Sequence, residues 1–334
     1  MVNPYEKYVQ VAEKLNELYR NFFIKFSTPQ ALNRGAMVYS GPFMLRRWVP
    51  GNSIEMVRNP NFPIKPEGGE SKYVQKVVYR FIQNTNSLLV AVIGGSIDAT
   101  SSVSLTFDQG RSPQLVRRAP GRFDIWFVPG AIWEHIDINK FENCQVVKDL
   151  GLNDKRTRQA ILHALNREGL VKAFFDGLQP VAHTWIAPVN PLFNPNVKKY
   201  GFDLKKAEAL LAEMGWRKGP DGILAKGGQR FAFTLMTNQG NKTRSKAAEV
   251  IQKNLKAVGI DVSIRIVEWA AFLKECVNPR QFDAVILGWT IPRDPDSFDV
   301  WHSSKTGPAE LNHVSFKNAE VDALLEKGRR TFDQ

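Results

Sequence analysis

The sequence predicts an α/β protein of two lobes. From residue 231 to residue 287, three apolar β-forming runs alternate with two helical segments, which is the β-α-β-α-β order of a partly parallel sheet. Before that part of the chain, short β-rich runs separated by turn residues are frequent. We therefore place a first lobe of mixed α/β type with hairpins at 1–143, and a second α/β lobe at 144–334.

The elements of the first lobe are predicted from local patterns. Apolar residues at helical spacing favour a helix over the first twenty residues, and two β-rich runs around a Pro-Gly turn at 49–52 predict a hairpin. A short apolar helix opens at Thr85 and closes at Gly94. Strands are expected at 73–82, 97–99, 123–128 and 132–138.

Helices are more frequent in the second lobe. Asp154 is the predicted N-cap of the first of them. An irregular, proline-rich connection follows at 179–200, which is typical of a binding loop or an arm wrapped on the surface. The remaining elements are a helix from Asp203 to Gly215, a strand at 231–235, a helix at 242–258 ended by Gly259, a strand at 260–266 and a buried strand at 284–287.

Composition and charge narrow the class of protein. Of 334 residues, 43% are hydrophobic and 23% are charged, so the chain can form a sizeable packed core. The formal net charge is +12, but the basic residues are dispersed as short doublets. Without a basic run, an aromatic RNA-binding motif or zinc-finger spacing, we expect no nucleic-acid partner. No export signal opens the chain, which indicates either a cytosolic protein or a chain whose beginning is missing.

The sequence carries no catalytic or metal-binding motif. The five histidines stand apart, and no nucleophile elbow, phosphate-binding loop or dinucleotide fingerprint occurs. Cys144 and Cys276 are either one disulfide or two buried thiols. A peptide-acting enzyme that uses Arg293, Asp294 and Asp296 is the alternative from another class, but it lacks a partnered nucleophile or base. We predict no enzyme, no metal site and no cofactor.

One loop, residues 288–298, is the candidate binding site. A buried strand ends there, and ligands of open α/β sheets gather beyond the carboxyl ends of strands. Trp289 can stack on a flat ligand group, and Asp294 can receive an amine. The alternative is that Trp289 seals the edge of the core while Asp294 and Asp296 only shape the turn.

Several short sequence blocks follow one another in a characteristic order. They are Ser40–Phe43, Trp48–Gly51, Arg58–Phe62, Gly94–Asp98, Asn153–Ala160, Asn166–Glu168, Gly259–Val262, Phe282–Trp289 with Asp294–Asp296, and Asn318–Leu325. In this order, over about residues 35–330, they closely resemble family 5 of the bacterial extracellular solute-binding proteins, the dipeptide, oligopeptide and nickel type. A single block is a weak signal, whereas six or more in the right order are a strong one.

The resemblance implies a type II periplasmic-binding-protein-like fold, in which two α/β lobes joined by a hinge close around a ligand. It implies a monomeric substrate-binding component of an ABC transporter, located in the periplasm or elsewhere outside the cytoplasm, or lipid-anchored there. Such a protein captures peptides and delivers them to a membrane permease. A nickel chelate or another small solute is the alternative ligand. Members of the family are usually longer, so we expect a fragment with an incomplete first lobe and without its signal.

The resemblance also directs the choice of ligand-binding residues. We expect Trp289 and Asp294 first, then Arg293, Trp185, Asn238 and Arg244 as neighbours in the cleft. Peptide binders of the family place an Asp three residues after the Trp to hold the α-amine, where this chain has Pro292. Asp294 is expected to substitute for it. The departure argues against dipeptide-style recognition of the amine and leaves a longer peptide or a different solute as open alternatives.

Overall fold

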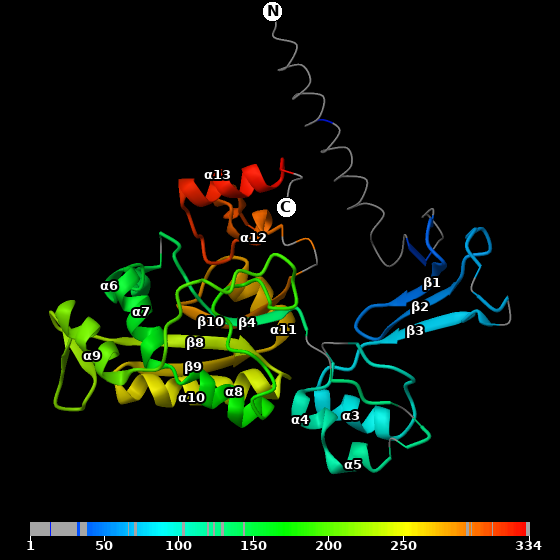
Figure 1. Ribbon diagram of the computed structural model, residues 1–334, viewed down its shortest axis with the longest axis horizontal. Helices are drawn as coiled ribbons and strands as arrows, with labels where there is room; N and C mark the ends of the chain where they lie inside the picture. The colour runs from blue at the N-terminus through cyan, green and yellow to red at the C-terminus, as the bar shows by residue number, and fades with distance from the viewer. Residues whose placement is uncertain are drawn as a thin grey trace, which may run out of the picture. The chain divides into compact units, whose positions relative to one another are not determined.

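The computed structural model describes residues 14, 32–33 and 39–331, apart from residues 66, 70–71, 102–103, 119, 123, 128–129, 143, 292–293, 295 and 309. The chain divides into two compact units, Met1–Gln83 and Asn84–Gln334 (Figure 1). The helix expected in the first twenty residues lies outside the described residues, apart from Lys14, which is helical.

The described part of the first unit is a three-stranded antiparallel sheet. Its strands are β1 (Phe43–Val49), β2 (Ser53–Arg58) and β3 (Lys76–Arg80), in the order β1-β2-β3. The predicted hairpin is confirmed, and Gly51 supplies the positive φ of 69° that its turn requires. Buried Asn59 closes one end of the sheet, because its side-chain amide donates to the carbonyls of Tyr39 and Gly41.

The second unit is built on a four-stranded sheet of order β4-β10-β8-β9. The strands are β4 (Ile132–Ile138), β8 (Ala232–Asn238), β9 (Asp261–Val267) and β10 (Ala284–Thr290). β8 pairs in parallel with both β9 and β10, which confirms the β-α-β-α-β prediction. β4 pairs antiparallel with β10. We expected this strand in the first lobe, but the structure places it in the sheet of the second unit. The lobe boundary at residues 143 and 144 stays a prediction.

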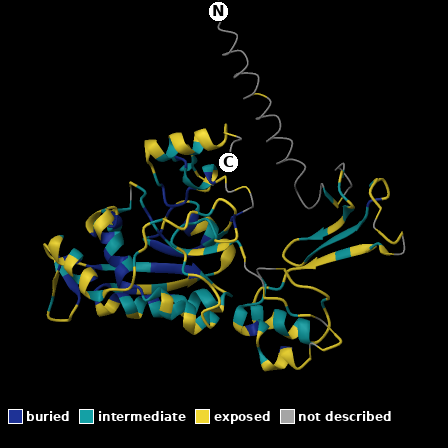
Figure 2. Cartoon of the chain, viewed as in Figure 1, coloured by how far each residue is buried: buried dark blue, intermediate teal, exposed yellow. Residues whose placement is uncertain are grey.

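Apolar side chains cover both faces of this sheet. On one face Ala284 and Ile286 of β10 pack with the helices α7 (Lys155–Ala164), α9 (Leu204–Glu213) and α10 (Lys242–Ala257). On the other face the alternate residues Val285 and Leu287 pack against η2 (Phe272–Val277), a π-helical segment. Figure 2 shows the strands between these layers as the most buried part of the unit. The predicted caps Asp154 and Asp203 are confirmed, since each side chain accepts a bond from the first turn of its helix.

Smaller elements surround the sheet. The strands β5 (Arg217–Lys218), β6 (Leu224–Lys226) and β7 (Gln229–Arg230) form a separate small sheet. The other helices are α3 (Thr85–Ile93), α4 (Phe107–Gly110), α5 (Pro113–Val116), α6 (Gln145–Asp149), α8 (Arg167–Phe175), α11 (Trp269–Ala271), α12 (Phe298–Trp301), η3 (Ser303–Lys305) and α13 (Ala319–Gly328). Residues 179–200 contain no helix or strand, as predicted for the proline-rich connection.

Two predicted strands are wrong. Residues 97–99 and the described residues 124–127 are irregular. β-forming side chains stabilise a strand only when its backbone finds a partner to pair with. Both segments take up irregular backbone around the short helices α3, α4 and α5 instead.

The structure also answers the question about the cysteines. Cys144 is a half-buried free thiol and Cys276 is a buried one, so they do not form a disulfide. Burial raises the pKa of the Cys144 thiol above its usual range. Among the residues that the structure describes, no helix is both long enough and apolar enough to cross a membrane.

Gly259 is the glycine whose replacement we expect to cost most. It ends α10 with a φ of +85°, and a Cβ there would lie 2.9 Å from the carbonyl oxygen of Gly222 and 3.0 Å from Leu224 Cγ. We predict that Gly259→Ala lowers the free energy of unfolding by at least ~1 kcal/mol, measured by urea denaturation. Gly201→Ala is the matched control, because a Cβ at that glycine meets nothing within 4 Å. Equal stability of the two variants would contradict this view of the α10–β9 turn.

Candidate ligand-binding site

The carboxyl ends of the parallel strands define one edge of the central sheet. β8 ends at Asn238, β9 at Val267 and β10 at Thr290, and all three run in the same direction. β4 runs the opposite way, so its first residues lie at the same edge, where Ile132 pairs with Thr290. We call this the carboxyl edge. In open α/β sheets it is the edge at which ligands bind.

A cluster of charged and polar side chains lies on one face of the carboxyl edge. Arg244, in the first turn of α10, donates from Nε and Nη2 to the two carboxylate oxygens of Glu134 at 2.9 Å and 2.8 Å. Its Nη1 donates to Asn238 Oδ1 at 2.7 Å. The Arg244 side chain is 13% exposed and that of Glu134 is 47% exposed. The structure thus brings together Asn238 and Arg244, which the sequence predicted, with Glu134, which it did not.

Gly288 makes this cluster possible. It is the register partner of Glu134 on the neighbouring strand. A Cβ at Gly288 would lie 2.6 Å from Glu134 Oε1 and 3.2 Å from Arg244 Nη2. Since real Cβ atoms do not approach so closely, the glycine leaves the space in which the carboxylate and the guanidinium meet.

Trp289 lies on the other face of the same edge. It is half-buried, and its register partner on β4 is Trp133, so the two indoles share one face of the sheet. Each is stacked on a histidine. The ring centroids of Trp289 and His313 are 5.7 Å apart at 27°, and those of Trp133 and His135 are 3.8 Å apart at 19°. Trp289 is therefore neither fully exposed nor sealed in the core.

A second group of aromatic residues continues from Trp133. Trp301 of α12 lies 6.2 Å from Trp133 and 5.8 Å from Trp185, measured between ring centroids. Trp185 belongs to the proline-rich connection, and its Nε1 donates to Ser297 Oγ at 2.9 Å. This bond attaches the connection to the loop that follows β10. Trp185 is half-buried, as an aromatic residue that lines a site would be.

The loop after β10 is held by its own acidic residues. Asp294 is exposed, and its Oδ1 accepts a bond from the backbone N–H of Asp296 at 3.2 Å. Asp296 in turn accepts from Phe298 N and forms an ion pair with Arg329, which lowers the pKa of the Asp296 carboxyl. Both carboxylates thus make contacts of the kind expected if Asp294 and Asp296 only shape the turn. Arg293 lies outside the described residues.

Buried ionisable groups lie beneath the indoles. His135 Nε2 is 3.1 Å from Asp137 Oδ2, and both side chains are less than a tenth exposed. Burial lowers the pKa of His313, with a smaller opposing effect from Asp137. A neutral imidazole is therefore favoured behind Trp289. Its stacking on the indole is aromatic packing more than a cation–π contact.

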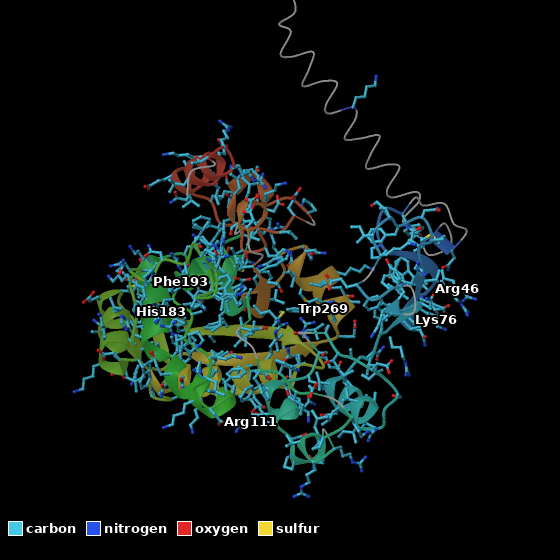
Figure 3. All side chains as sticks on the ribbon, turned by 45° about the vertical axis from the view of Figure 1, so that its right-hand side comes forward. Arg46, Lys76, Arg111, His183, Phe193 and Trp269 are labelled. Carbon is cyan, nitrogen blue, oxygen red and sulfur yellow. The ribbon has the colours of Figure 1, made fainter. Side chains whose placement is uncertain are left out.

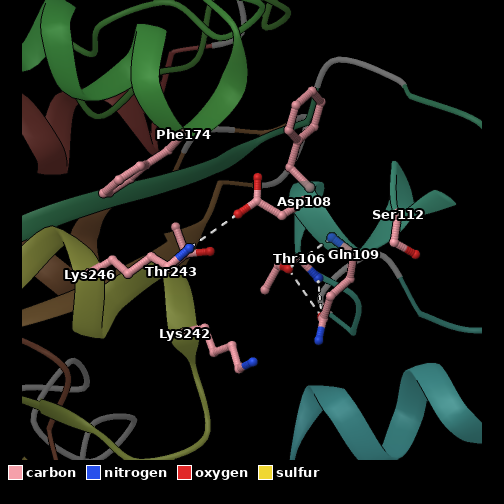
Figure 4. Close-up of a pocket in the computed structure, with 9 residues that line it drawn as sticks. Thr106, Asp108, Gln109, Ser112, Phe174, Lys242, Thr243 and Lys246 are labelled. Carbon is pink, nitrogen blue, oxygen red and sulfur yellow. Dashed lines mark hydrogen bonds and ion pairs between the residues drawn. The ribbon is translucent and has the colours of Figure 1, made fainter. Parts of the chain in front are cut away.

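A pocket of about 200 Å³ opens beside the first turn of α10 (Figure 4). Its lining includes Lys242 and Lys246 of α10, Asp108 of α4 and Phe174 of α8. Lys246 Nζ lies 3.5 Å from Asp108 Oδ2. The pocket contains none of the predicted ligand-binding residues, although Arg244 belongs to the same helical turn. Its lining thus combines a locally paired lysine with an exposed one, beside the ring of Phe174.

Trp269 is a further aromatic residue at the carboxyl edge that the sequence did not single out. Glu268 separates it from the end of β9, and it begins α11 (Figure 3). Its side chain is 47% exposed, which is unusual for so large an apolar group. Figure 3 also shows side chains with nitrogen and oxygen atoms on many parts of the surface of the second unit.

Glu134, Trp133, Trp301 and His313 were missed by the sequence analysis. The first two lie on a strand whose span was predicted correctly but whose partner was not. The alternation of Trp133, His135 and Asp137 along that strand was the available signal, because it sends three unusual side chains to one face. Without the pairing to β10, that face could not be assigned to the site.

The sheet and its carboxyl edge define an α/β protein of the open-sheet type, and comparison with known proteins identifies the family. The family described as "Bacterial extracellular solute-binding proteins, family 5 Middle" matches residues 3–310. The chain therefore belongs to the family 5 bacterial extracellular solute-binding proteins, which confirms the resemblance seen in its sequence blocks.

Individual relatives are similar over most of this chain. The crystal structure of an oligopeptide binding protein from Thermus thermophilus complexed with pentapeptide is 65% identical, with a TM-score of 0.83, and the match covers 99% of this chain and 60% of that one. The structure of the oligopeptide-binding protein AppA from Bacillus subtilis in complex with a nonapeptide is 34% identical, with a TM-score of 0.72, and the match covers 88% and 55%.

In a comparison of sequences, AppA from Bacillus subtilis is 33% identical over 321 residues, 90% of this chain and 53% of AppA. The chain thus spans about half the length of the curated relative it matches. The matches to solved structures confirm the predicted two-lobed type II α/β fold. They do not test the individual site residues, which stay predictions.

The Arg244–Glu134 pair offers a test of how rigid the carboxyl edge is. We predict a coupling energy of about 1–2 kcal/mol in a double-mutant cycle of Arg244→Ala and Glu134→Ala, read from urea unfolding. The control cycle uses Lys218 and Glu208, whose side chains are 48% and 44% exposed and meet in a single contact of 2.7 Å. That pair should give less than about 0.5 kcal/mol. Equal coupling in both cycles would argue against a preformed cluster.

Proposed function

We propose that this chain is part of the substrate-binding component of an ABC transporter, which captures peptides outside the cytoplasmic membrane. The observation that carries the proposal is its 65% identity to an oligopeptide binding protein whose crystal structure contains a pentapeptide. Membership of the extracellular solute-binding family supports a periplasmic or other extracytoplasmic location. The partners are a peptide ligand and a membrane permease, and we assign the receptor a monomeric state, with a lipid anchor as one form of attachment.

The carboxyl edge is where we place the peptide, enclosed by the closure of two lobes divided near residues 143 and 144. Trp289, Trp133 and Trp185 offer flat apolar surfaces against which side chains of different shape can stack. Main-chain hydrogen bonds to an extended peptide would be the same for every sequence. Stacking and main-chain bonding together favour broad tolerance for side chains.

The acidic residues at the edge differ in how well they could receive the peptide's amino group. Both carboxylate oxygens of Glu134 already accept hydrogen bonds from Arg244. Asp294 is exposed, and its Oδ1 accepts the weaker, uncharged backbone N–H of Asp296. An incoming ammonium would compete with a guanidinium at Glu134 but not at Asp294. We therefore keep Asp294 as the proposed amine receptor, with Arg244 and Asn238 positioning the edge.

Two alternative functions would give other results in a peptide-binding test. A nickel chelate or another small solute would bind in the same fold. Among the described residues, no three His, Cys, Asp or Glu side chains group as metal ligands, so a chelate would have to be recognised through its organic part. A peptide-acting enzyme would show turnover of a bound peptide, and we assign this chain no catalytic step.

Peptide binding should appear as ligand-dependent stabilisation. At a peptide concentration about 100 times Kd, the folded state gains about 2.7 kcal/mol, which raises Tm by a few degrees. We predict this shift with peptides of mixed sequence from a library of three to nine residues, and none with a nickel–histidine chelate. A shift with the chelate alone would move the assignment to small solutes, and peptide cleavage detected by mass spectrometry would favour the enzyme.

The same measurement of ligand-dependent stabilisation tests the proposed role of Trp289. Trp289→Ala should weaken peptide binding at least ~10-fold because it removes a stacking surface, whereas Trp289→Phe should weaken it only a few-fold. Phe202→Ala is the control, since Phe202 is an exposed aromatic residue immediately before the helix α9. Unchanged affinity in Trp289→Ala, with the variant folded, would exclude Trp289 from the ligand site.

A further inference from the structure

A second pocket lies at the opposite edge of the central sheet. It has a volume of about 200 Å³, and its lining includes Lys140, Asn153, Ser315 and Lys317 together with one carboxylate, Glu142. β4 ends at Ile138, which pairs with Ala284, the first residue of β10. Lys140 follows this end closely, so the pocket lies at the amino ends of the parallel strands. We call it the amino-edge pocket. The proposed peptide site at the carboxyl edge does not use it.

The charges around the amino-edge pocket are not balanced. Lys317 Nζ is paired with Glu142 Oε1 at 3.1 Å, and both side chains are more than half exposed. Lys140 is half-buried, and within the described part of the chain no carboxylate lies at ion-pair distance from its Nζ. Its ammonium lies 5.0 Å from the ring centroid of Phe316 instead.

A third cation adds to this imbalance. Arg158 is held beside the pocket by neutral groups, because its Nη1 donates to the carbonyls of Leu152 and Asn153 at 3.0 Å and 2.7 Å. Burial and the repulsion of Arg158 both lower the pKa of Lys140. An anion placed between these groups would relieve that repulsion and replace the hydration that Lys140 has lost.

Ser315 provides an unused hydrogen-bonding group at the same place. It is 6% exposed, and its hydroxyl is buried without a hydrogen-bond partner in the structure. Its φ is +56°, a conformation that is costly for a residue other than glycine. Buried Asn312 holds the turn, since its carbonyl accepts from Ser315 N and its side chain bonds the carbonyls of His302 and Phe316. A strained residue with an orphaned hydroxyl is typical of a binding site.

We propose that the amino-edge pocket binds a small tetrahedral oxyanion such as phosphate. Lys140 supplies the main point charge, with Lys317 of the same lining paired to Glu142 as a secondary one. The Ser315 hydroxyl and the Asn153 amide are donors for the remaining oxygens. Lysine suits a tetrahedral anion, because its ammonium is a compact point charge with three rotatable donors. The pocket volume accommodates such an ion together with some of its waters.

The test is a titration of this chain with inorganic phosphate at constant ionic strength, with chloride as the replaced ion. We expect saturable stabilisation in thermal unfolding and a heat of binding in calorimetry. Sulfate should bind in the same pocket, and acetate should bind at least ~10-fold more weakly because it is planar and carries a single charge. Acetate binding as tightly as phosphate would overturn the assignment to a tetrahedral anion.

Two variants locate the site. Lys140→Met removes the charge but keeps the length of the side chain, and should weaken phosphate binding at least ~10-fold. Ser315→Gly removes the hydroxyl and relieves the positive φ, so this variant should fold at least as well as the parent while it binds phosphate several-fold more weakly. Lys327→Met is the control, because Lys327 lies in the last turn of α13 away from the pocket lining.

The results separate the proposal from general salt effects. Stabilisation that does not saturate, or that is the same in Lys140→Met, Ser315→Gly and the control, would overturn the site. If Lys140→Met fails to fold in chloride, Ser315→Gly alone decides, because its backbone conformation favours glycine. Loss of phosphate affinity in Ser315→Gly with Lys327→Met unchanged supports the proposal.

Discussion

The pairing of β10 with β4 on one side and with β8 on the other is the constraint on which the carboxyl edge depends. β10 is buried along Ala284–Leu287, so only its last residues can reach a ligand. The alternation of a strand then sends Gly288 and Trp289 to opposite faces. On one face the missing Cβ leaves room for the carboxylate of Glu134, and on the other the indole meets His313. A register shift of one residue would exchange the faces and remove both features.

Several polar groups of β4 and the carboxyl edge are paired within the protein. Arg244 binds Glu134 and Asn238, and Asp137 binds His135. A ligand that needed one of these paired charges would have to break a bond within the protein, which costs most of what it gains. Asp294 differs from these groups, because it is exposed and its Oδ1 accepts an uncharged backbone N–H. Under the proposed function, aromatic stacking and main-chain bonds then act beside Asp294, and these interactions tolerate many peptide sequences.

Much of the sheet could be predicted because its signals are local. The apolar run of β10, the alternation along β9 and the helical spacing of α10 each depend on neighbours in the sequence. The span of β4 was predicted equally well, but its partner was not, because pairing with β10 joins segments far apart in the chain. The site residues fall into the same two groups, those predictable from local signals and those that depend on strand pairing. Trp289 and Arg244 adjoin recognisable elements, whereas Glu134 joins the site only through the register of β4 against β10.

How strongly a lysine of this protein attracts an anion depends on its local surroundings. A lysine that is exposed keeps its water, and one that meets a carboxylate, such as Lys246 with Asp108, is neutralised locally. Neither attracts an anion strongly. Lys140 has lost part of its hydration, no carboxylate among the described residues forms an ion pair with it, and Arg158 adds repulsion. Binding of an anion at Lys140 would therefore relieve this repulsion and replace the lost hydration, although the chain as a whole has no basic run. Local compensation of each charge, more than the total of +12, decides where an anionic partner can bind.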